Sequence, residues 1–201
     1  MRGNRVYLFS PLNESEDQWR KTKNGEKTTT VLKLATSEDT KKCYDIIDTG
    51  RKFQQEQGFT QWTKEYPSFR TIQQDIADKK GFVVMVWRAI AGYMCIDFSG
   101  EPAYENIEGK WHSSEAYAVV HRMAFAPEFR GIGLSDTVWK LIGEYCLKNG
   151  IGYIRVDTDF PNKRMQHILE KNGFAKCGII SFQGSGKIAY DKQLQLVSCD
   201  T

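Results

Sequence analysis

The sequence has few of the residues that build metal centres or disulfide frameworks. Its 201 residues include three histidines and five cysteines, and no Cys-x-x-Cys pair occurs. The histidines are far apart and none has a second ligand at metal spacing, so we predict no metal site. The cysteines are odd in number, widely spaced and mostly flanked by apolar residues, which favours reduced, buried thiols. The histidines are His112, His121 and His167, and the cysteines are Cys43, Cys95, Cys146, Cys177 and Cys199.

Charge of one sign and long apolar runs are also scarce. The 28 basic and 25 acidic residues leave a formal net charge of +3 with no basic run, so nucleic acid is not an expected partner. No run of about 18 apolar residues, the length needed to span a membrane, occurs. Residues 1–13 contain no apolar stretch of the length found in signal peptides. We therefore expect a cytoplasmic protein with no membrane partner.

The chain is expected to form one domain behind a polar extension. Residues 1–29 are polar, mixed in charge and weakly periodic, whereas residues 30–201 carry regular apolar patterns. In the first helix, from Ser37, the apolar residues Cys43, Ile46, Ile47 and Phe53 are predicted to face inward. The full prediction is strands at 30–35, 82–87, 91–98, 117–125, 153–157, 176–183 and 187–195, helices from 37, at 68–79, 133–148 and 162–172, and loops at 58–67 and 99–115.

Residues 121–136 carry the strongest functional signal. An apolar strand runs through Pro127 into a glycine turn that opens a long amphipathic helix. Gly131 and Gly133 allow close approach of the backbone, and the free amides of the first helical turn then point at a ligand. This pattern predicts an anion site that fits a pyrophosphate. A tight turn that binds nothing remains open as the alternative.

Other glycine motifs with known chemistry do not match. A dinucleotide fingerprint needs a third glycine where Asp136 stands, and Gly-Lys-Ser/Thr, the mark of a nucleotide phosphate loop, is absent. Gly-x-Ser-x-Gly, the mark of a serine nucleophile, does not occur either. Gly184-Ser185-Gly186 is more typical of a hairpin turn.

The segment Arg130-Gly131-Ile132-Gly133-Leu134-Ser135 resembles the Gln/Arg-x-x-Gly-x-Gly/Ala signature of the GNAT superfamily of acetyl-CoA-dependent N-acetyltransferases. Ser135 stands in place of the usual Gly or Ala. The order of predicted elements is similar over about residues 30–195. The resemblance implies an α/β (α+β) fold with a mixed, mostly antiparallel central sheet flanked by helices. Its central strands, 117–125 and 153–157, are expected to splay apart.

The resemblance also implies which residues bind acetyl-CoA. The backbone of the strand before the motif is expected to pair with the pantetheine arm, and the glycine turn is expected to hold the pyrophosphate. Asn162, at the head of a helix that ends in Gly173-Phe174, is expected to touch the pantetheine arm and also suits a helix N-cap. The complete set is Met123, Ala124, Phe125, Arg130, Gly131, Ile132, Gly133, Leu134, Ser135, Asp136 and Asn162.

The catalytic groups are less clearly marked. Many family members place a Tyr general acid seven residues after this asparagine, but the residue here is Leu169. We assign no other acid, because a thiolate with a pKa of about 8.5 is a tolerable leaving group. Two bases remain open: His121, expected on the same strand face as Val119, Met123 and Phe125, and Asp157. Each also suits a structural role, and Glu115 suits a solvated loop.

Substrate selection is predicted in the loop and helices from Phe59 to Phe69 and in the loop at 100–116. Trp62, Tyr66, Tyr104 and Trp111 are aromatic residues in polar segments that suit an acceptor pocket or, equally, lid packing. The expected function is transfer of acetyl to a primary amine of a small molecule or peptide, by direct attack in a ternary complex. A catalytically weak acyl-CoA-binding sensor or regulatory module is the alternative, and a structural subunit a third. The resemblance also implies that the protein can form a homodimer, whichever of these functions it has.

Overall fold

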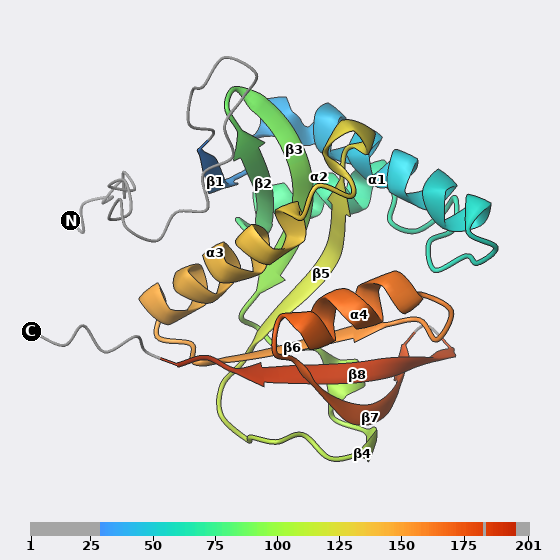
Figure 1. Ribbon diagram of the computed structural model, residues 1–201, viewed down its shortest axis with the longest axis vertical. Coiled ribbons are helices and arrows are strands. Elements are labelled where there is room, and N and C mark those ends of the chain that lie inside the picture. Colours follow the sequence, from blue (N-terminus) through green and yellow to red (C-terminus); the bar gives the residue numbers. More distant parts are fainter. Residues whose placement is uncertain (1–28, 183, 196–201) are drawn as a thin grey trace, which may run out of the picture.

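The computed structural model describes residues 29–182 and 184–195, so the predicted extension at 1–29 lies almost wholly outside the described residues. Eight strands form one sheet in the order β1-β2-β3-β5-β6-β8-β7-β4 (Figure 1). The strands are β1 (Thr30–Leu34), β2 (Gly81–Val86), β3 (Ala89–Asp97), β4 (Ile107–Gly109), β5 (Ala118–Phe125), β6 (Tyr153–Thr158), β7 (Ala175–Phe182) and β8 (Ser185–Gln193). Only β5 and β6 pair in parallel among the described strands. The predicted fold class is therefore confirmed.

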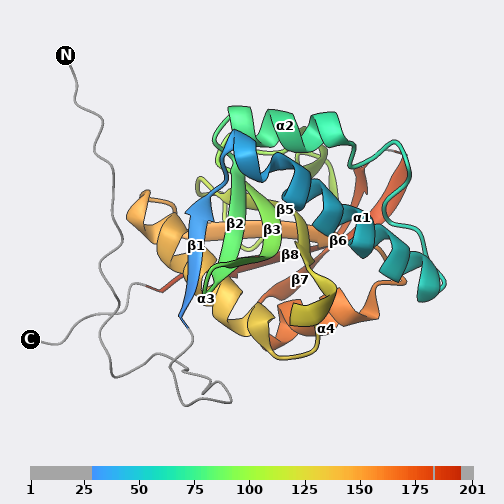
Figure 2. The same ribbon diagram turned by 90° about the horizontal axis from the view of Figure 1, so that it is seen from above.

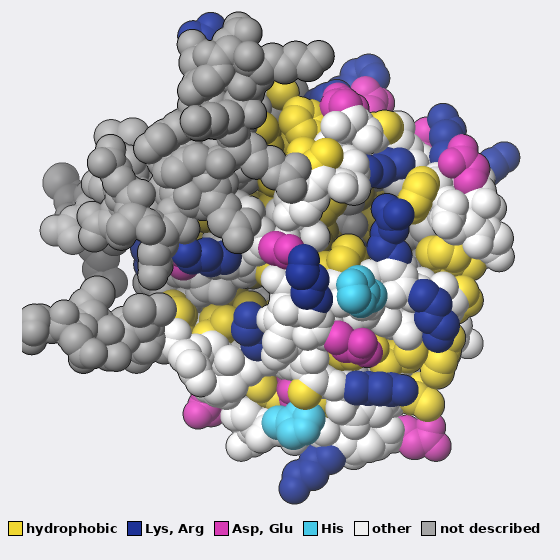
Figure 3. Space-filling model, in the orientation of Figure 1, with side chains coloured by type: hydrophobic (Ala, Val, Ile, Leu, Met, Phe, Trp, Pro, Cys, Tyr) yellow, Lys and Arg dark blue, Asp and Glu magenta, His cyan; other side chains and the backbone are white. Residues whose placement is uncertain are grey.

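Four α-helices cover the sheet in two layers within the described part of the chain (Figure 2). Helices α1 (Thr40–Glu56) and α2 (Phe69–Ala77) lie on one face, and α3 (Leu134–Lys148) and α4 (Lys163–Lys171) lie on the other. Each presents an apolar stripe: Ile46 and Ile47 of α1 pack near Tyr93, while Ile142 of α3 packs in the opposite core. None of the described helices is long and apolar enough to cross a membrane. Basic and acidic side chains are interspersed on the face shown in Figure 3.

The segment 99–115, predicted as a loop, contains two short elements. Pro102–Tyr104 forms a 3-10 helix, and β4 pairs with β7 from Ile107 to Gly109. Two further 3-10 turns, Ser37–Asp39 and Pro127–Phe129, precede α1 and α3. A strand of three residues is too short to show the alternation of apolar and polar residues that identifies strands in a sequence, and β4 depends on pairing with the distant strand β7. The loop prediction was therefore wrong for these residues.

Strands β5 and β6 separate soon after they meet. Their pairing consists of Ala118 opposite Ile154 and Val119 opposite Arg155. Beyond these two positions, the part of the chain that the structure describes provides no strand partner for the β6-facing edge of residues 120–125. The predicted splay is therefore confirmed, and it exposes backbone along β5 to the interior of the molecule.

A bulge at Arg122 reverses the side-chain alternation of β5. Arg122 has a φ of 55°, and the register with β3 shifts by one residue between the Cys95 and Tyr93 positions. Val119 therefore packs beside Tyr104, whereas Met123 and Phe125 pack against the core under α3 and α4. The expectation that His121 shares a face with Val119, Met123 and Phe125 was wrong for the last two.

Candidate active site

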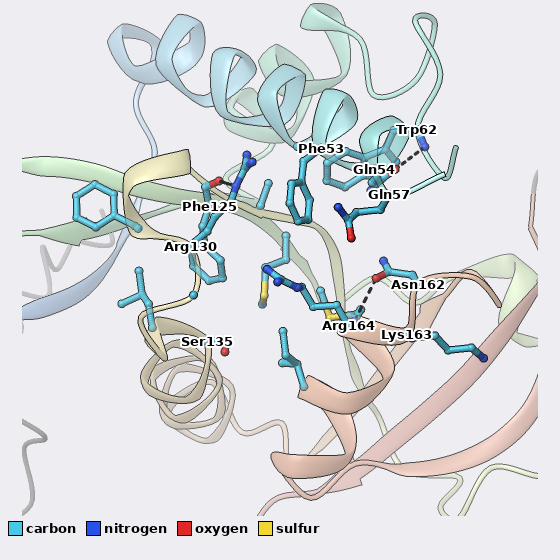
Figure 4. A pocket seen from close by; sticks show the side chains of 18 of the residues that line it. Phe53, Gln54, Gln57, Trp62, Phe125, Arg130, Ser135, Asn162, Lys163 and Arg164 are labelled. Carbon is cyan, nitrogen blue, oxygen red and sulfur yellow. Dashed lines mark hydrogen bonds between the residues drawn. The ribbon is translucent and has the colours of Figure 1, made fainter. Parts of the chain in front are cut away.

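A cavity of about 430 Å³ lies where the sheet splays. Its walls are α1, the end of β5, the glycine turn and the first turns of α3 and α4 (Figure 4). The residues predicted to bind the cosubstrate line it, except Ile132 and Asp136. One continuous cavity therefore joins the unpaired edge of β5 to the start of α3.

The glycine turn forms the anion-binding end of this cavity. Gly131 and Gly133 have φ values of 74° and 78°, in the left-handed region that glycine adopts without strain. Gly133 is the N-cap of α3, so it has no side chain that accepts from the amides of the first turn. These amides and the helix dipole favour a negatively charged ligand. The local geometry therefore fits a phosphate-bearing cosubstrate.

Arg130 anchors this turn. Its Nε donates to the carbonyl oxygen of Phe125 at 2.8 Å, and its Nη2 donates to Oγ1 of Thr49 at 3.0 Å. The guanidinium carbon lies 5.1 Å from the centre of the Phe53 ring. Arg130 thus fixes the glycine turn to both β5 and α1 while it lines the cavity.

Two predicted cosubstrate residues lie outside the cavity wall. The side chain of Ile132 is exposed. The carboxylate of Asp136 pairs with Lys171 and accepts from Asn172, and its amide donates to the carbonyl of Gly133 at 3.3 Å. Asp136 therefore links α3 to α4, and its side chain contributes to packing of these helices.

Asn162 takes the predicted N-cap role, while its contact with the pantetheine arm stays a prediction. Its side-chain oxygen accepts from the amide of Met165 at 3.1 Å, which caps α4, and its side-chain nitrogen donates to Oε1 of Gln61 at 2.9 Å. The residue also lines the cavity. It therefore holds the loop after α1 against the start of α4.

The sequence interpretation missed several wall residues, among them Phe53 and Arg164. Phe53 was predicted to face the core, but its ring lies half-buried in the cavity wall, with the Arg164 guanidinium carbon 5.2 Å from its centre. Lys163 and Arg164 place two cations at the positive end of the α4 dipole, which disfavours the helix. Basic residues at such a position are a readable signal for an anionic ligand.

Trp62 lies at the back of this same cavity. Its ring packs between α1 and β5, and a Cβ at Gly50 would lie only 2.9 Å from it. Oε1 of Gln54 accepts from the amides of Gln61 and Trp62 at 3.2 and 3.1 Å. Trp62, predicted for the acceptor, therefore shapes the cosubstrate cavity.

Asp157 lies on β6 just past the splay, facing away from α3 and α4. Burial raises its pKa to about 6, against the opposing effect of a hydrogen bond from Tyr104. The Tyr104 hydroxyl donates to Oδ2 at 2.8 Å, and burial holds the pKa of Tyr104 well above its usual range. The carboxylate of Glu101, close by, raises the pKa of Asp157 further. Asp157 is thus a half-buried carboxyl group whose pKa is raised to about 6.

His121, the other predicted base, is poorly suited to the role. Burial lowers its pKa to about 3, and the charge of Arg122 acts in the same direction. Its Nε2 lies 3.7 Å from Oε2 of Glu101. The imidazole is therefore neutral at physiological pH and is a weak proton acceptor there.

Arg122, which the sequence analysis did not single out, organises the side of β5 that bears Tyr66 and Asp75. We name this the acceptor side because Tyr66 is one of the residues predicted to contact the acceptor. Its Nε and Nη2 donate to the two carboxylate oxygens of Asp75 at 2.9 and 2.7 Å, and its Nη1 donates to the Tyr66 hydroxyl at 2.8 Å. The Tyr93 hydroxyl also donates to Asp75. This network fixes Tyr66, whose pKa is raised by burial and, to a smaller extent, by the nearby charge of Asp157.

Three further residues considered in the sequence analysis, Trp111, Glu115 and Leu169, lie outside the cavity wall. The Trp111 indole nitrogen donates to the carbonyl of Tyr104 at 3.0 Å, and the Arg155 guanidinium carbon lies 4.3 Å from the Trp111 ring centre. Glu115 is exposed and accepts from Gln193. Leu169 is buried in the core beneath α4. Of the four predicted acceptor residues, Tyr66 and Tyr104 therefore lie near Asp157, while Trp111 supports Tyr104 from behind.

Comparisons with known proteins agree with this geometry. The family model described as "Acetyltransferase (GNAT) family" matches residues 47–174. A GNAT-family acetyltransferase from Streptococcus agalactiae 2603 is 31% identical, with a TM-score of 0.76 over 83% of this chain and 96% of that chain. A GNAT-family acetyltransferase from Listeria monocytogenes 4b F2365 is 21% identical, with a TM-score of 0.66 over 82% and 95% of the two chains.

A more distant structure shares the fold. AAC(6')-Ib in complex with ribostamycin and coenzyme A is 16% identical, with a TM-score of 0.63 over 86% of this chain and 99% of that chain. The search of curated proteins gave no significant match. The family match covers residues 47–174, and the Streptococcus relative shares the fold at 31% identity. The chain therefore belongs to the GNAT family of acetyltransferases, whose cosubstrate is acetyl-CoA.

Proposed function

We propose that the protein is an N-acetyltransferase that moves acetyl from acetyl-CoA to a primary amine of a small molecule or peptide, by direct attack in a ternary complex. The environment of the Asp157 carboxyl group is the observation that carries this proposal. The group is half-buried beside the splay, has a pKa raised to about 6, and lies on the face of β6 away from the helix cores of α3 and α4. AAC(6')-Ib, which shares the fold, is described in complex with ribostamycin, and such an acceptor chemistry is compatible with this proposal.

Proton removal is the chemical need that Asp157 meets. An alkyl amine with a pKa near 10.4 is neutral in only about one molecule in 10³ at pH 7. Its nitrogen becomes strongly acidic as the bond to the acyl carbon forms, so a carboxylate with a pKa near 6 is then a competent acceptor. The Tyr104 hydrogen bond orients the carboxylate. When bound, acetyl-CoA would supply the activated acyl group, and Gly131, Gly133 and the first turn of α3 would hold its phosphates; their left-handed φ values and the N-cap without a side chain support this assignment.

The test is a pH–rate profile with Asp157→Asn as the variant and Glu115→Gln as the matched control. Release of the CoA thiol is followed with a panel of primary amines. In the unmodified protein, kcat/KM should fall as the pH drops below about 6, where Asp157 becomes protonated. Asp157→Asn should lower kcat/KM by about 10²- to 10⁴-fold and leave acetyl-CoA affinity unchanged. Glu115→Gln removes an exposed carboxylate and should change neither.

The alternative, a catalytically weak acyl-CoA sensor, is favoured by one observation. Leu169 occupies the position of the usual phenol and is buried in the core, so no general acid stands there. If this alternative holds, acetyl-CoA binds, no amine is turned over, and Asp157→Asn has no effect. If acetyl-CoA binds and Asp157→Asn acetylates amines as fast as the unmodified protein, the protein is a transferase but Asp157 is not its base.

A further inference from the structure

Three potential metal ligands lie close together where the loop after β4 passes strands β7 and β8, outside the wall of the cosubstrate cavity. His112 lies in the loop after β4, Cys177 on β7 and Asp191 on β8, and one ligand atom of each lies within 4.8 Å of the others. The His112 Nδ1 is 2.8 Å from Oδ1 of Asp191 and 3.5 Å from Sγ of Cys177. Asp191 is buried, whereas His112 is exposed to solvent. His112 is 65 and 79 positions from its two partners, so no local spacing in the sequence indicates the cluster.

The backbone fixes this arrangement. Gly109 and Gly178 face each other where β4 meets β7, and a Cβ on either would lie 2.2–2.3 Å from a carbonyl oxygen of the other strand. The two glycines therefore permit a close approach that other residues would block. The amide of Lys110 then donates to the carbonyl of Cys177 at 3.1 Å, which directs the chain that leads to His112 onto β7 and β8.

The second carboxylate oxygen of Asp191 is held separately. It accepts from the backbone amide of His112 at 2.8 Å and from the Tyr153 hydroxyl. These two donors orient the carboxylate and leave Oδ1 aimed at the imidazole. Supporting hydrogen bonds of this kind commonly orient the carboxylate ligands of metal ions.

A nucleophilic relay does not explain the cluster. In such a relay the imidazole uses one nitrogen for the nucleophile and the other for the carboxylate. Here the sulfur and the carboxylate oxygen both approach Nδ1. Three donor atoms gathered around one point are the arrangement that a metal ion requires.

We propose that Nδ1 of His112, the thiolate of Cys177 and Oδ1 of Asp191 bind one Zn²⁺ ion, with water in the solvent-facing fourth position. A mixed N, S and O ligand set suits zinc, and bonds of about 2.0–2.3 Å at tetrahedral angles separate ligand atoms by about 3.3–3.5 Å. The sulfur already lies at that distance from Nδ1, and Oδ1 must retreat from Nδ1 by roughly half an ångström. The third pair, Sγ and Oδ1, lies within 4.8 Å and must settle at about 3.5 Å when the ion binds. Binding releases the thiol proton to solvent and leaves the imidazole proton on Nε2.

The charges balance. One thiolate and one carboxylate neutralise the two charges of the ion. Arg155 is the cation whose charge acts on Cys177, and it is already engaged by the carbonyl of Ser113 at 2.8 Å and by the Trp111 ring. A neutral metal site is not repelled by this guanidinium. The ion would tie the loop of Trp111, which donates to Tyr104, to β7 and β8.

The experiment uses the full chain, freed of metal by a chelator and then titrated with Zn²⁺ against a competing indicator. One ion per chain should bind, and the melting temperature should rise with zinc. His112→Ala and Cys177→Ser should each weaken binding by at least about 100-fold, because even the loss of an outer partner costs 10- to 100-fold. His167→Ala removes an exposed histidine on α4, outside the cluster, and should leave affinity unchanged.

Cobalt gives a readout that does not depend on the variants folding. Co²⁺ bound to the unmodified protein should show a thiolate-to-metal charge-transfer band and the visible bands of a tetrahedral site. The proposal is overturned if the unmodified protein retains no zinc at micromolar free ion. Equal zinc affinity in His112→Ala, Cys177→Ser and the unmodified protein, or a cobalt spectrum without thiolate ligation, overturns it as well.

Discussion

The two sides of β5 are built in different ways. The cosubstrate side consists largely of backbone: the glycine turn, the free amides of α3 and the unpaired strand edge all come from residues 120–136. The acceptor side consists of side chains from separate elements, with the Asp75 carboxylate buried, Arg122 half-buried beside it and Asp157 half-buried beside Tyr104. A backbone site tolerates most substitutions except those at its glycines. A buried charged network depends on each of its members.

Gly133→Glu should have the largest effect and break the cosubstrate side alone. The substitution forces a φ of 78° on a residue with a Cβ and places a carboxylate at the anion site. We expect acetyl-CoA affinity, measured by calorimetry, to fall by more than about 100-fold. The Asp157 network should remain folded.

Gly150→Glu is the matched control for this change. Gly150 also has a positive φ, of 77°, but follows α3 at the end distant from the cavity. A Cβ at this position would have no heavy atom of the described residues within 4 Å beyond its chain neighbours. The control carries the same strain and the same charge. Equal loss of binding in both variants would show that strain, and not the anion site, explains the effect.

Arg122→Met should break the acceptor side through stability. It leaves the Asp75 carboxylate buried with only the Tyr93 hydroxyl as a partner among the described side chains. We expect the free energy of unfolding, from urea denaturation, to fall by about 3–5 kcal/mol. Tyr66→Phe removes only one neutral acceptor from Arg122 and should cost about 0.5–1.5 kcal/mol. Similar losses in the two variants would contradict the buried-charge argument.

The same contrast explains what the sequence predicted. The glycine turn and nearly all helices and strands follow from local patterns, because neighbouring residues make the turn, the cap and the apolar stripe. The splay was expected from the resemblance to the GNAT superfamily. Gly131, Gly133 and Asn162 therefore lie where the motif placed them. Asp157, at the end of a central strand, was predicted as a candidate base from the resemblance, and its role as the base stays a prediction.

Features that depend on distant contacts were not predictable in this way. Arg122 lies in a strand, and its partner Asp75 is 47 residues earlier, so no local pattern joins them. The bulge at Arg122 adds one residue to the alternation and turned His121 away from the face of Met123. Burial, which weakens His121 as a base and strengthens Asp157, is likewise set by tertiary packing.

Tyr104→Phe should sharpen the role of Asp157 with a smaller effect. The lost hydrogen bond stabilises the ionised carboxylate, so its removal raises the pKa of Asp157 above about 6. The acidic limb of kcat/KM should therefore move to higher pH, by about one unit. Tyr117→Phe is the control, since its ring stacks on Tyr104 and its hydroxyl accepts from the amide of Glu101. If the acidic limb of kcat/KM moves in neither variant, or moves equally in both, then the limb does not report the ionisation of Asp157.

Arg164→Ala should have the smallest effect and tests a side-chain charge on the cosubstrate side. Arg164 lies beside Phe53 and points into the cavity, whereas Lys163 extends away from it (Figure 4). Because the Arg164 side chain is exposed, its attraction to a phosphate is screened, and we expect acetyl-CoA affinity to fall by about two- to fivefold. The difference should shrink as salt is raised in a calorimetric titration. Lys163→Ala removes an equal charge one residue away and should have less effect at every salt concentration; equal effects would mean that net charge at the start of α4 matters and the position of the guanidinium does not.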